Sequence, residues 1–511
     1  MTALQANMTN TEINHYDQLQ NKPVTVGTMN FAQLLEHDWP LALDAYQRGF
    51  VWDDEKVEQL INDLETYQKD TDQTLPYYMG TLLLHHDAEN SKRFIIDGQQ
   101  RITALCLLYY RLIAAAPKGQ KLTYSGQSER RIKNVVALLK DGNKLPDTKI
   151  FERLRFTVIS VTNADLAFTF FDTQNNRGVR LQATDLLKAY HLRSIDQNSN
   201  DKTIGQHLQK ACATRWEHIQ RQAPILSLGS DFAPNLFARF LWRARRWQGT
   251  QVKPADQDSL LKEFQTNSWT QEKDTLAKVD TIPVYACRTN QLAQSMQMQN
   301  GSLSLQGSSI PLSSNAASLP MALRQPIHKG LGFFLYAEKY AALLQELRSK
   351  QNSHHEVREF QTIHENLLLK NQVYLREAFW LASLMYVDQF GYQKLATFAL
   401  YLEFILGGIR LAKHQIKRET AANFFRDGKL NLLDVIAQSY HPHQVLDYLI
   451  QQHPRYNQPY QDERIDSGKG VRGRYKKAVL DFFYADDGQS SQHLAKKLSW
   501  MTNKVKAFND D

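Results

Sequence analysis

The sequence predicts two kinds of structure in succession: an α+β domain over residues 26–200, followed by a large all-α region. Three observations lead to this fold class. Short apolar runs between polar turns, as at residues 81–96, are typical of strands. Beyond residue 200 apolar residues recur at helical spacing and few strand patterns remain. The length of 511 residues exceeds what one hydrophobic core supports, so we expect two or three domains.

Local composition divides the chain further. Residues 1–25 are polar, which predicts a flexible N-terminus without a signal peptide. Residues 201–289 form a predicted helical region. Residues 290–325 are rich in Ser, Gln and Asn and indicate a loop or linker, and residues 326–511 are expected to form a helical C-terminal domain.

The overall composition is that of an ordinary soluble globular protein. A net charge of +8 permits nucleic-acid binding without requiring it. The three cysteines are far apart, which favours a reducing cytoplasm and argues against a zinc finger or a disulfide scaffold. They are Cys106, Cys212 and Cys287. The most apolar stretch, residues 396–412, contains Glu403 and Arg410, so we interpret it as a buried helix and not a membrane span.

In the first half of the α+β domain, the fold is expected to begin at residues 26–35. Residues 46–52 follow as a loop or short strand. Asp53 is a suitable N-cap for a helix with an apolar face. That face consists of Val57, Leu60, Ile61 and Leu64. Residues 81–85 and 93–96, separated by a polar turn, predict a β-hairpin.

The next segments predict further elements. We expect helices at residues 99–116 and 129–140, a strand at 156–161, and a helix at 164–174 with Asn163 as its cap. In the C-terminal half the pattern predicts long helices. They are expected at residues 329–351, 373–389, 392–413 and 491–508.

Residues 94–104, Phe-Ile-Ile-Asp-Gly-Gln-Gln-Arg-Ile-Thr-Ala, organise the predicted domain. A buried strand turns through Gly98 into a helix, and the free N–H groups at a helix start favour a phosphate. Arg101 can add a bidentate contact to that phosphate. Asp97 can hold Mg²⁺ beside it or polarise a water. The alternative is a helix start at which Asp97 and Arg101 only pair with each other.

The pattern Gly98-x-x-Arg101-x-x-Ala104 resembles the phosphate-binding box of the ParB/sulfiredoxin-like superfamily. The longer string Asp-Gly-Gln-Gln-Arg, residues 97–101, resembles the hallmark of the GmrS-type domain of GmrSD-like, modification-dependent restriction systems. The resemblance implies a ParB/sulfiredoxin-like N-terminal fold with a nucleotide pocket. Its residues would include Gly98, Gln99, Gln100, Arg101 and Thr103.

Two other stretches extend the resemblance. Tyr-Gln-Arg-Gly-Phe-Val-Trp, residues 46–52, resembles the opening of GmrS-type domains, which implies that Arg48 lies close to the nucleotide pocket. Otherwise Arg48 is a surface charge beside core aromatics. Residues 171–188 resemble the third conserved segment of the family. There Asn175 would bind a metal or phosphate, and Arg177 would neutralise charge during phosphoryl transfer. The alternative is an Asn-rich turn with solvated arginines.

Outside these stretches the signals are weaker. Residues 237–247 predict a helix with Arg239, Arg243 and Arg246 on one side, which suits either nucleic-acid contact or a core face beside a solvated face. Residues 466–477 predict a basic loop with several glycines, without the spacing of a Walker A motif. The loop either contacts the DNA backbone or is only exposed to solvent. The C-terminal histidines lack the ββα-metal pattern of an HNH nuclease and are interpreted as structural. They are His441, His443 and His453.

The resemblance implies a cytoplasmic prokaryotic protein that couples NTP binding or hydrolysis to DNA recognition in defence against foreign, modified DNA. The expected cofactors are an NTP, with GTP favoured, and Mg²⁺. The expected catalytic residues are Asp97 and Arg101, and DNA is the expected partner, with a nuclease or another defence protein beside it and no membrane. Two alternatives remain: a ParB-like nuclease that uses the same pocket, and a non-catalytic adaptor that binds another protein.

Overall fold

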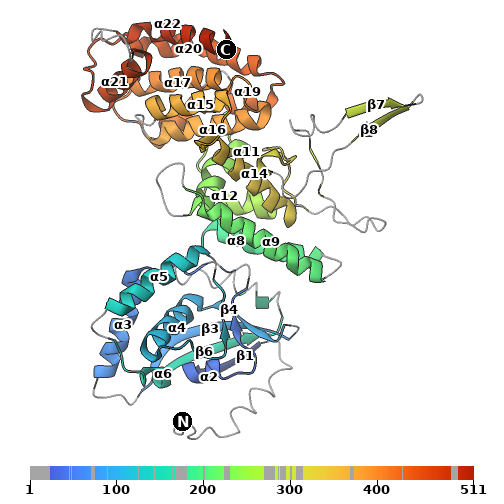
Figure 1. Cartoon of the computed structure of the whole chain (residues 1–511), viewed down its shortest axis with the longest axis vertical. Helices are drawn as coiled ribbons and strands as arrows, with labels where there is room; N and C mark the ends of the chain where they lie inside the picture. The colour runs from blue at the N-terminus through green and yellow to red at the C-terminus, as the bar shows by residue number, and fades with distance from the viewer. Residues whose placement is uncertain are drawn as a thin grey trace. The chain divides into compact units, whose positions relative to one another are not determined.

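The computed structural model divides into two compact units, Met1–Leu192 (unit 1) and Arg193–Asp511 (unit 2), which are described separately (Figure 1). It describes residues 24–44, 47, 49–70, 75–88, 90–124, 126–141, 145–163, 166–167, 170, 181–198, 202–223, 231–269, 282, 284–285, 287, 295–299, 302–306, 315–368, 373–427, 430–484 and 493–510. A mixed α/β sheet domain comes first and a largely helical region follows, so the predicted fold class is confirmed.

Unit 1 is built on a six-stranded sheet with strand order β1-β6-β3-β4-β2-β5. Its strands are β1 (Val24–Asn30), β2 (Leu41–Ala42), β3 (Tyr77–Asp87), β4 (Lys92–Asp97), β5 (Gln120–Lys121) and β6 (Leu154–Val161). Its helices are α2 (Phe31–Leu35), α3 (Asp54–Lys69), α4 (Gln99–Ile113), α5 (Gly126–Asp141) and α6 (Ile150–Arg153), and α8 (Ala183–Asn198) crosses the boundary between the units.

The sheet mixes parallel and antiparallel pairs. β3 and β4 form the predicted hairpin, which is confirmed, and β1 pairs antiparallel with β6. β3 runs parallel to β6, and the pairing between them shifts register between Tyr78 and Thr81. At this irregularity in the middle of β3, the carbonyls of Met79 and Thr81 accept hydrogen bonds from Arg101 of α4.

Asp53 caps α3 as predicted, because its Oδ1 accepts a hydrogen bond from the Lys56 N–H over 3.1 Å. Asp54 and Glu55 follow in the first turn, where carboxylates interact favourably with the helix dipole. The whole predicted apolar face of α3 is buried. These signals are local, which is why the sequence alone located the helix.

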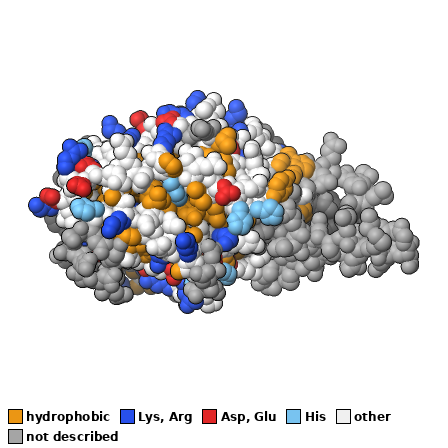
Figure 2. Space-filling view, turned by 90° about the horizontal axis from the view of Figure 1, so that it is seen from above, with side chains coloured by type: hydrophobic (Ala, Val, Ile, Leu, Met, Phe, Trp, Pro, Cys, Tyr) orange, Lys and Arg blue, Asp and Glu red, His pale blue; other side chains and the backbone are white. Residues whose placement is uncertain are grey.

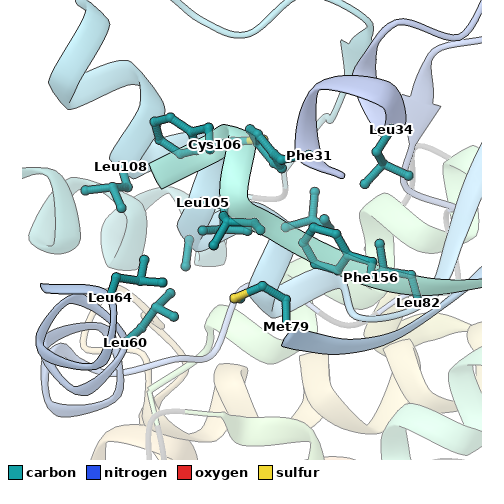
Figure 3. Close-up of a cluster of buried hydrophobic side chains, with 14 of the residues drawn as sticks. Phe31, Leu34, Leu60, Leu64, Met79, Leu82, Leu105, Cys106, Leu108 and Phe156 are labelled. Carbon is teal, nitrogen blue, oxygen red and sulfur yellow. The ribbon is translucent and has the colours of Figure 1, made fainter. Parts of the chain in front are cut away.

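The core of unit 1 lies between the sheet and its helices. Figure 3 shows side chains of α2, α3 and α4 converging on β3 and β6. The residues labelled there are Phe31, Leu34, Leu60, Leu64, Met79, Leu82, Leu105, Cys106, Leu108 and Phe156. Burying a large apolar side chain stabilises a fold by about 1.5–3 kcal/mol. This packing fixes the end of β4 and the start of α4 relative to β3.

A half-buried histidine, His86 near the turn of the β3–β4 hairpin, makes the stability of unit 1 depend on pH. Burial, reinforced by the charge of Arg93, lowers the pKa of His86 to about 3. His37 and Trp39 pack against its ring, and His85 also opposes its protonation. Because the pKa in the unfolded chain is near 6.5, the unfolded chain takes up the proton first as the pH falls.

We therefore expect the free energy of unfolding of unit 1 to fall between pH 6.5 and pH 4, by up to about 1.4 kcal/mol per pH unit from His86. Urea unfolding at several pH values measures this slope. His86→Phe should flatten it, since the phenyl ring cannot take up a proton. Equal slopes in the variant and the wild type would contradict the assignment to His86.

Unit 2 is largely helical, with one hairpin of β7 (Ser295–Gln299) and β8 (Ser302–Gln306) inside the stretch expected to be a loop or linker. Its first part contains α9 (Lys202–Arg221), α10 (Phe232–Asn235), η1 (Leu236–Leu241), α11 (Trp242–Arg246), α12 (Gln257–Leu261), η2 (Lys262–Thr266), η3 (Ala316–Ser318), α14 (Leu331–Arg348), α15 (His355–Ile363) and η4 (His364–Leu368). Its second part contains α16 (Val373–Phe390), α17 (Leu395–Ala412), α18 (Arg418–Arg426), α19 (Leu432–Gln438), α20 (Pro442–Asn457), η5 (Gln458–Gln461), α21 (Gly470–Tyr484), η6 (Leu494–Lys496) and α22 (Lys497–Asp510).

Helix α17 is the centre of the C-terminal part of unit 2. It is long and apolar enough to cross a membrane, but 89% of the stretch Leu395–Ala412 is buried inside the protein. It packs against α15, α16, α20, α21 and α22, which surround it in Figure 1. The prediction that residues 396–412 form a buried helix is confirmed.

The basic stretch at residues 237–247 is not one regular helix, because η1 is a π-helical segment and α11 continues it. Arg239 and Arg243 both pair with the buried Glu377. Arg246 pairs with Glu263, so all three arginines have carboxylate partners inside the unit. The structure therefore favours the hypothesis that this segment packs in the core over the hypothesis that it contacts nucleic acid. On the face shown in Figure 2, Lys and Arg side chains are scattered among apolar and uncharged ones.

The C-terminal histidines, interpreted as structural from the sequence, belong to helix α20 and its N-cap. His441 is the N-cap of α20, and His443 and His453 lie within it. His453 is buried, and burial lowers its pKa to about 4. Within the part of the chain that the structure describes, no group of three His, Cys, Asp or Glu side chains is arranged to hold a metal ion.

Candidate phosphate site

The turn between β4 and α4 requires glycine at residue 98. The φ angle of Gly98 is 95°, in the left-handed region, and a Cβ there would collide with the side chain of Leu82. Gly98 is also the N-cap of α4, and it provides no side-chain hydrogen bond to the first helical turn. Gly98 therefore adds no side-chain cap to this 15-residue helix, and the N–H groups at a helix start favour anions.

Asp97 lies beside this helix start with its side chain 46% exposed. Its Oδ2 is 3.6 Å from Nη2 of Arg101. The pair predicted by the simpler interpretation therefore exists, but it is long and leaves the carboxylate open to solvent. Mg²⁺ is commonly held by one or two carboxylates together with substrate phosphates and water, so Asp97 fits an ion delivered with a nucleotide.

Arg101 is held mainly by the backbone of β3. Nη1 donates to the carbonyl of Met79 over 2.6 Å, and Nη2 donates to the carbonyl of Thr81 over 2.5 Å. Gly80 lies between them with a φ of 91°, and a Cβ there would collide with the guanidinium. Burial lowers the pKa of Arg101, although the Asp97 charge opposes this shift. Arg101 is thus a fixed cation at the helix start that also supports the irregular centre of β3.

Gln100 connects the first motif to the second. Its Oε1 accepts hydrogen bonds from the N–H groups of Val51 and Trp52, and its Nε2 donates to the carbonyl of Gly49. This side chain was predicted to contact the nucleotide. In the structure its amide holds the loop at residues 47–52, and the contact with a nucleotide remains a prediction.

Lys188 connects the third motif to the same loop. Its side chain is buried, and its Nζ donates to the carbonyl of Gln47 over 3.4 Å. Gln47 in turn donates from Nε2 to the carbonyl of Ile96, one residue before Asp97. All three sequence motifs therefore meet around the turn at residues 96–98. Lys188 is the last residue of the third motif, and the sequence alone indicated no role for it.

Ser128 and Arg131 of α5 also support the loop, and the sequence gave no signal for either. Ser128 accepts a hydrogen bond from the Phe50 N–H, and Arg131 donates to the carbonyl of Val51. Phe50 itself is buried, as predicted. Ser128 and Arg131 lie about 80 residues from their partners along the chain. Only tertiary structure reveals such contacts.

The remaining predicted residues fall into two groups. Thr103 is 1% exposed, donates to the carbonyl of Gln99 and accepts from the Tyr124 hydroxyl. Its hydroxyl is engaged in the interior and Gln99 is also buried, and the contacts of both residues with a nucleotide remain predictions. Arg48, Asn175 and Arg177 lie outside the described residues. The loop residues on both sides of Arg48, Gln47 and Gly49, are those held by Lys188 and Gln100.

Unit 1 is similar to one domain of the GmrSD-type restriction systems. Residues 31–192 match the family model described as the N-terminal domain of the GmrSD restriction endonuclease, which is consistent with a ParB/sulfiredoxin-like placement. Residues 208–467, just over half of the chain, match a family of unknown function (DUF7834), and the chain belongs to that family. No curated protein matches the chain. The first match places the chain with restriction-type defence proteins, which act on DNA.

Proposed function

We propose that unit 1 binds the phosphates of an NTP, with GTP favoured, together with Mg²⁺, and that the chain couples this binding or its hydrolysis to recognition of modified foreign DNA. The protein would work in the cytoplasm, with a nuclease or another defence protein as partner. The observation that carries the proposal is the meeting of three sequence motifs around an uncapped helix start.

The charges at this helix start suit a phosphate with a bound cation. The N–H groups of the first turn of α4 and the fixed guanidinium of Arg101 would hold phosphate oxygens. Asp97, half exposed beside them, would hold Mg²⁺ or orient an attacking water. Arg48, Asn175 and Arg177 would complete the pocket, since their motifs are anchored to the same turn through Gln47 and Lys188.

Nucleotide titration of the full chain by calorimetry tests this function, with GTP, ATP and CTP compared in the presence of Mg²⁺. We expect micromolar binding that Asp97→Asn weakens at least about tenfold, because the amide loses the charge that attracts the cation. The Asp97 carboxylate is only 3.6 Å from Arg101, a long contact, so the fold should persist in the variant.

The matched control is Asp54→Asn, which removes an exposed carboxylate on α3 and should bind nucleotide as the wild type does. Absence of binding by any nucleotide would contradict the proposal. Metal-dependent nicking of DNA by the isolated chain, lost in Asp97→Asn, would then favour the nuclease. If neither nucleotide nor DNA binds the chain, the adaptor is favoured.

A further inference from the structure

A second cationic centre lies in unit 2, at the C-terminal end of α17. Arg410 is completely buried, and its Nη2 donates to the carbonyls of Lys413 and His414, just beyond the helix. Its Nε and Nη1 are buried without a hydrogen-bond partner among the described residues. In those residues no carboxylate lies within ion-pair distance of it. A buried guanidinium N–H without a hydrogen-bond acceptor destabilises the fold, so its presence requires an explanation.

Arg472 of α21 adds a second positive charge in this region, and after burial its charge contributes to lowering the pKa of Arg410. Its Nε is also buried without a partner in the described residues, and its Nη2 donates to Asp462 over 3.0 Å. Arg472 lines a surface pocket together with Ala412, His414 and Asp462. The pocket thus borders the chain segment on which Arg410 is anchored.

The arginines around this pocket outnumber the carboxylates that pair with them. Asp462 is shared between Arg472 and Arg464, whose Nε lies 2.9 Å from the carboxylate. The other pocket carboxylate, Glu463, is 78% exposed and contributes little inside. Arg472 thus shares its carboxylate with Arg464, and Arg410 has none within ion-pair distance among the described residues. An anion in the pocket would offset their mutual repulsion and supply acceptors for the unpaired N–H groups.

We propose that this pocket binds a phosphate group through Arg472, with Arg410 supporting it from the interior. The N–H groups of a guanidinium match the oxygens of a phosphate in geometry. The attraction between the two charges is strongest where water is excluded. The site lies entirely within unit 2 and does not depend on the nucleotide site proposed for unit 1. The phosphate can belong to a nucleotide or to the DNA backbone, and the two sources are separable by experiment.

The test is a calorimetric titration of the full chain with inorganic phosphate at constant ionic strength. We expect Arg472→Gln to weaken phosphate binding by about tenfold or more, because a charge-assisted contact is lost. Arg410→Lys should also weaken it, since an ammonium keeps the charge but cannot replace the planar fork. Circular dichroism and thermal unfolding confirm that each variant is folded.

Arg358→Gln is the matched control, because it removes the same charge from an exposed position on α15 and should leave binding unchanged. Titrations with GTP and with a short DNA duplex then identify the source. A loss of duplex affinity in Arg472→Gln assigns the site to the DNA backbone, and a loss of GTP affinity assigns it to a nucleotide. If Arg472→Gln binds inorganic phosphate, GTP and duplex as tightly as the wild type, the proposed site is wrong.

Discussion

Lys497→Met is expected to lower the free energy of unfolding of unit 2 by about 3–5 kcal/mol, the cost of leaving one member of a buried ion pair alone. Lys497 is the first residue of α22, and its Nζ lies 2.6 Å from Glu403 of α17. Both side chains are at most 1% exposed. Without the ammonium, the Glu403 carboxylate would remain charged in the interior or take up a proton, and either outcome weakens the fold.

The surrounding hydroxyls make this cost larger. Lys497 also donates to the hydroxyls of Tyr475 and Tyr460, and Tyr475 donates to Glu403 over 2.5 Å. Gly407 makes room for both rings, because a Cβ there would collide with their hydroxyl groups. Helix α22 is therefore attached to α17 through a fully hydrogen-bonded network, and partial loss of such a network is especially unfavourable.

Urea unfolding followed by fluorescence measures the effect. Lys496→Met is the matched control, since it removes the same charge from an exposed neighbouring position and should change stability by less than about 0.5 kcal/mol. The double variant Lys497→Met with Glu403→Leu should recover part of the loss, because no unpaired charge remains. A loss below about 1 kcal/mol in Lys497→Met would show that the network does not hold the C-terminal helix.

The sequence predicted the elements whose signals are local. Asp53 as a helix cap, the hairpin of residues 81–96 and the helix starting at Gln99 all depend on neighbouring residues, and the structure contains each of them. The long C-terminal helices were also found, since buried helices show uninterrupted apolar periodicity. The hairpin of β7 and β8 was missed although apolar and polar residues alternate in both strands, because the abundance of Ser, Gln and Asn in this stretch was taken as the signal of a loop.

The candidate site was predictable in its motifs but not in the roles within them. Gln100 and Thr103 stand beside Arg101 in the sequence, yet a helix turns successive side chains by about 100° and sends them in different directions. Gln100 therefore reaches the loop at residues 47–52, while Thr103 points into the core. The roles of Lys188 and Ser128 depend on contacts across 141 and 78 residues of chain, which no local pattern encodes.

Arg101→Met is expected to destabilise unit 1 by about 2–4 kcal/mol, because two charge-assisted hydrogen bonds to backbone carbonyls are lost. The carbonyls of Met79 and Thr81 flank Gly80, where the pairing of β3 with β6 is already irregular, so no neighbouring strand replaces the lost donors. Arg101→Lys should be intermediate, since one ammonium cannot span both carbonyls with the geometry of the guanidinium.

Arg130→Met is the control for Arg101→Met, because Arg130 is an exposed arginine on α5. Urea unfolding should show no more than about 0.5 kcal/mol of change in that variant. Equal stability of Arg101→Met and the wild type would mean that Arg101 does not support β3. The comparison with Asp97→Asn then separates two roles at one helix start: the arginine variant should lose stability and nucleotide affinity together, whereas the aspartate variant should lose affinity alone.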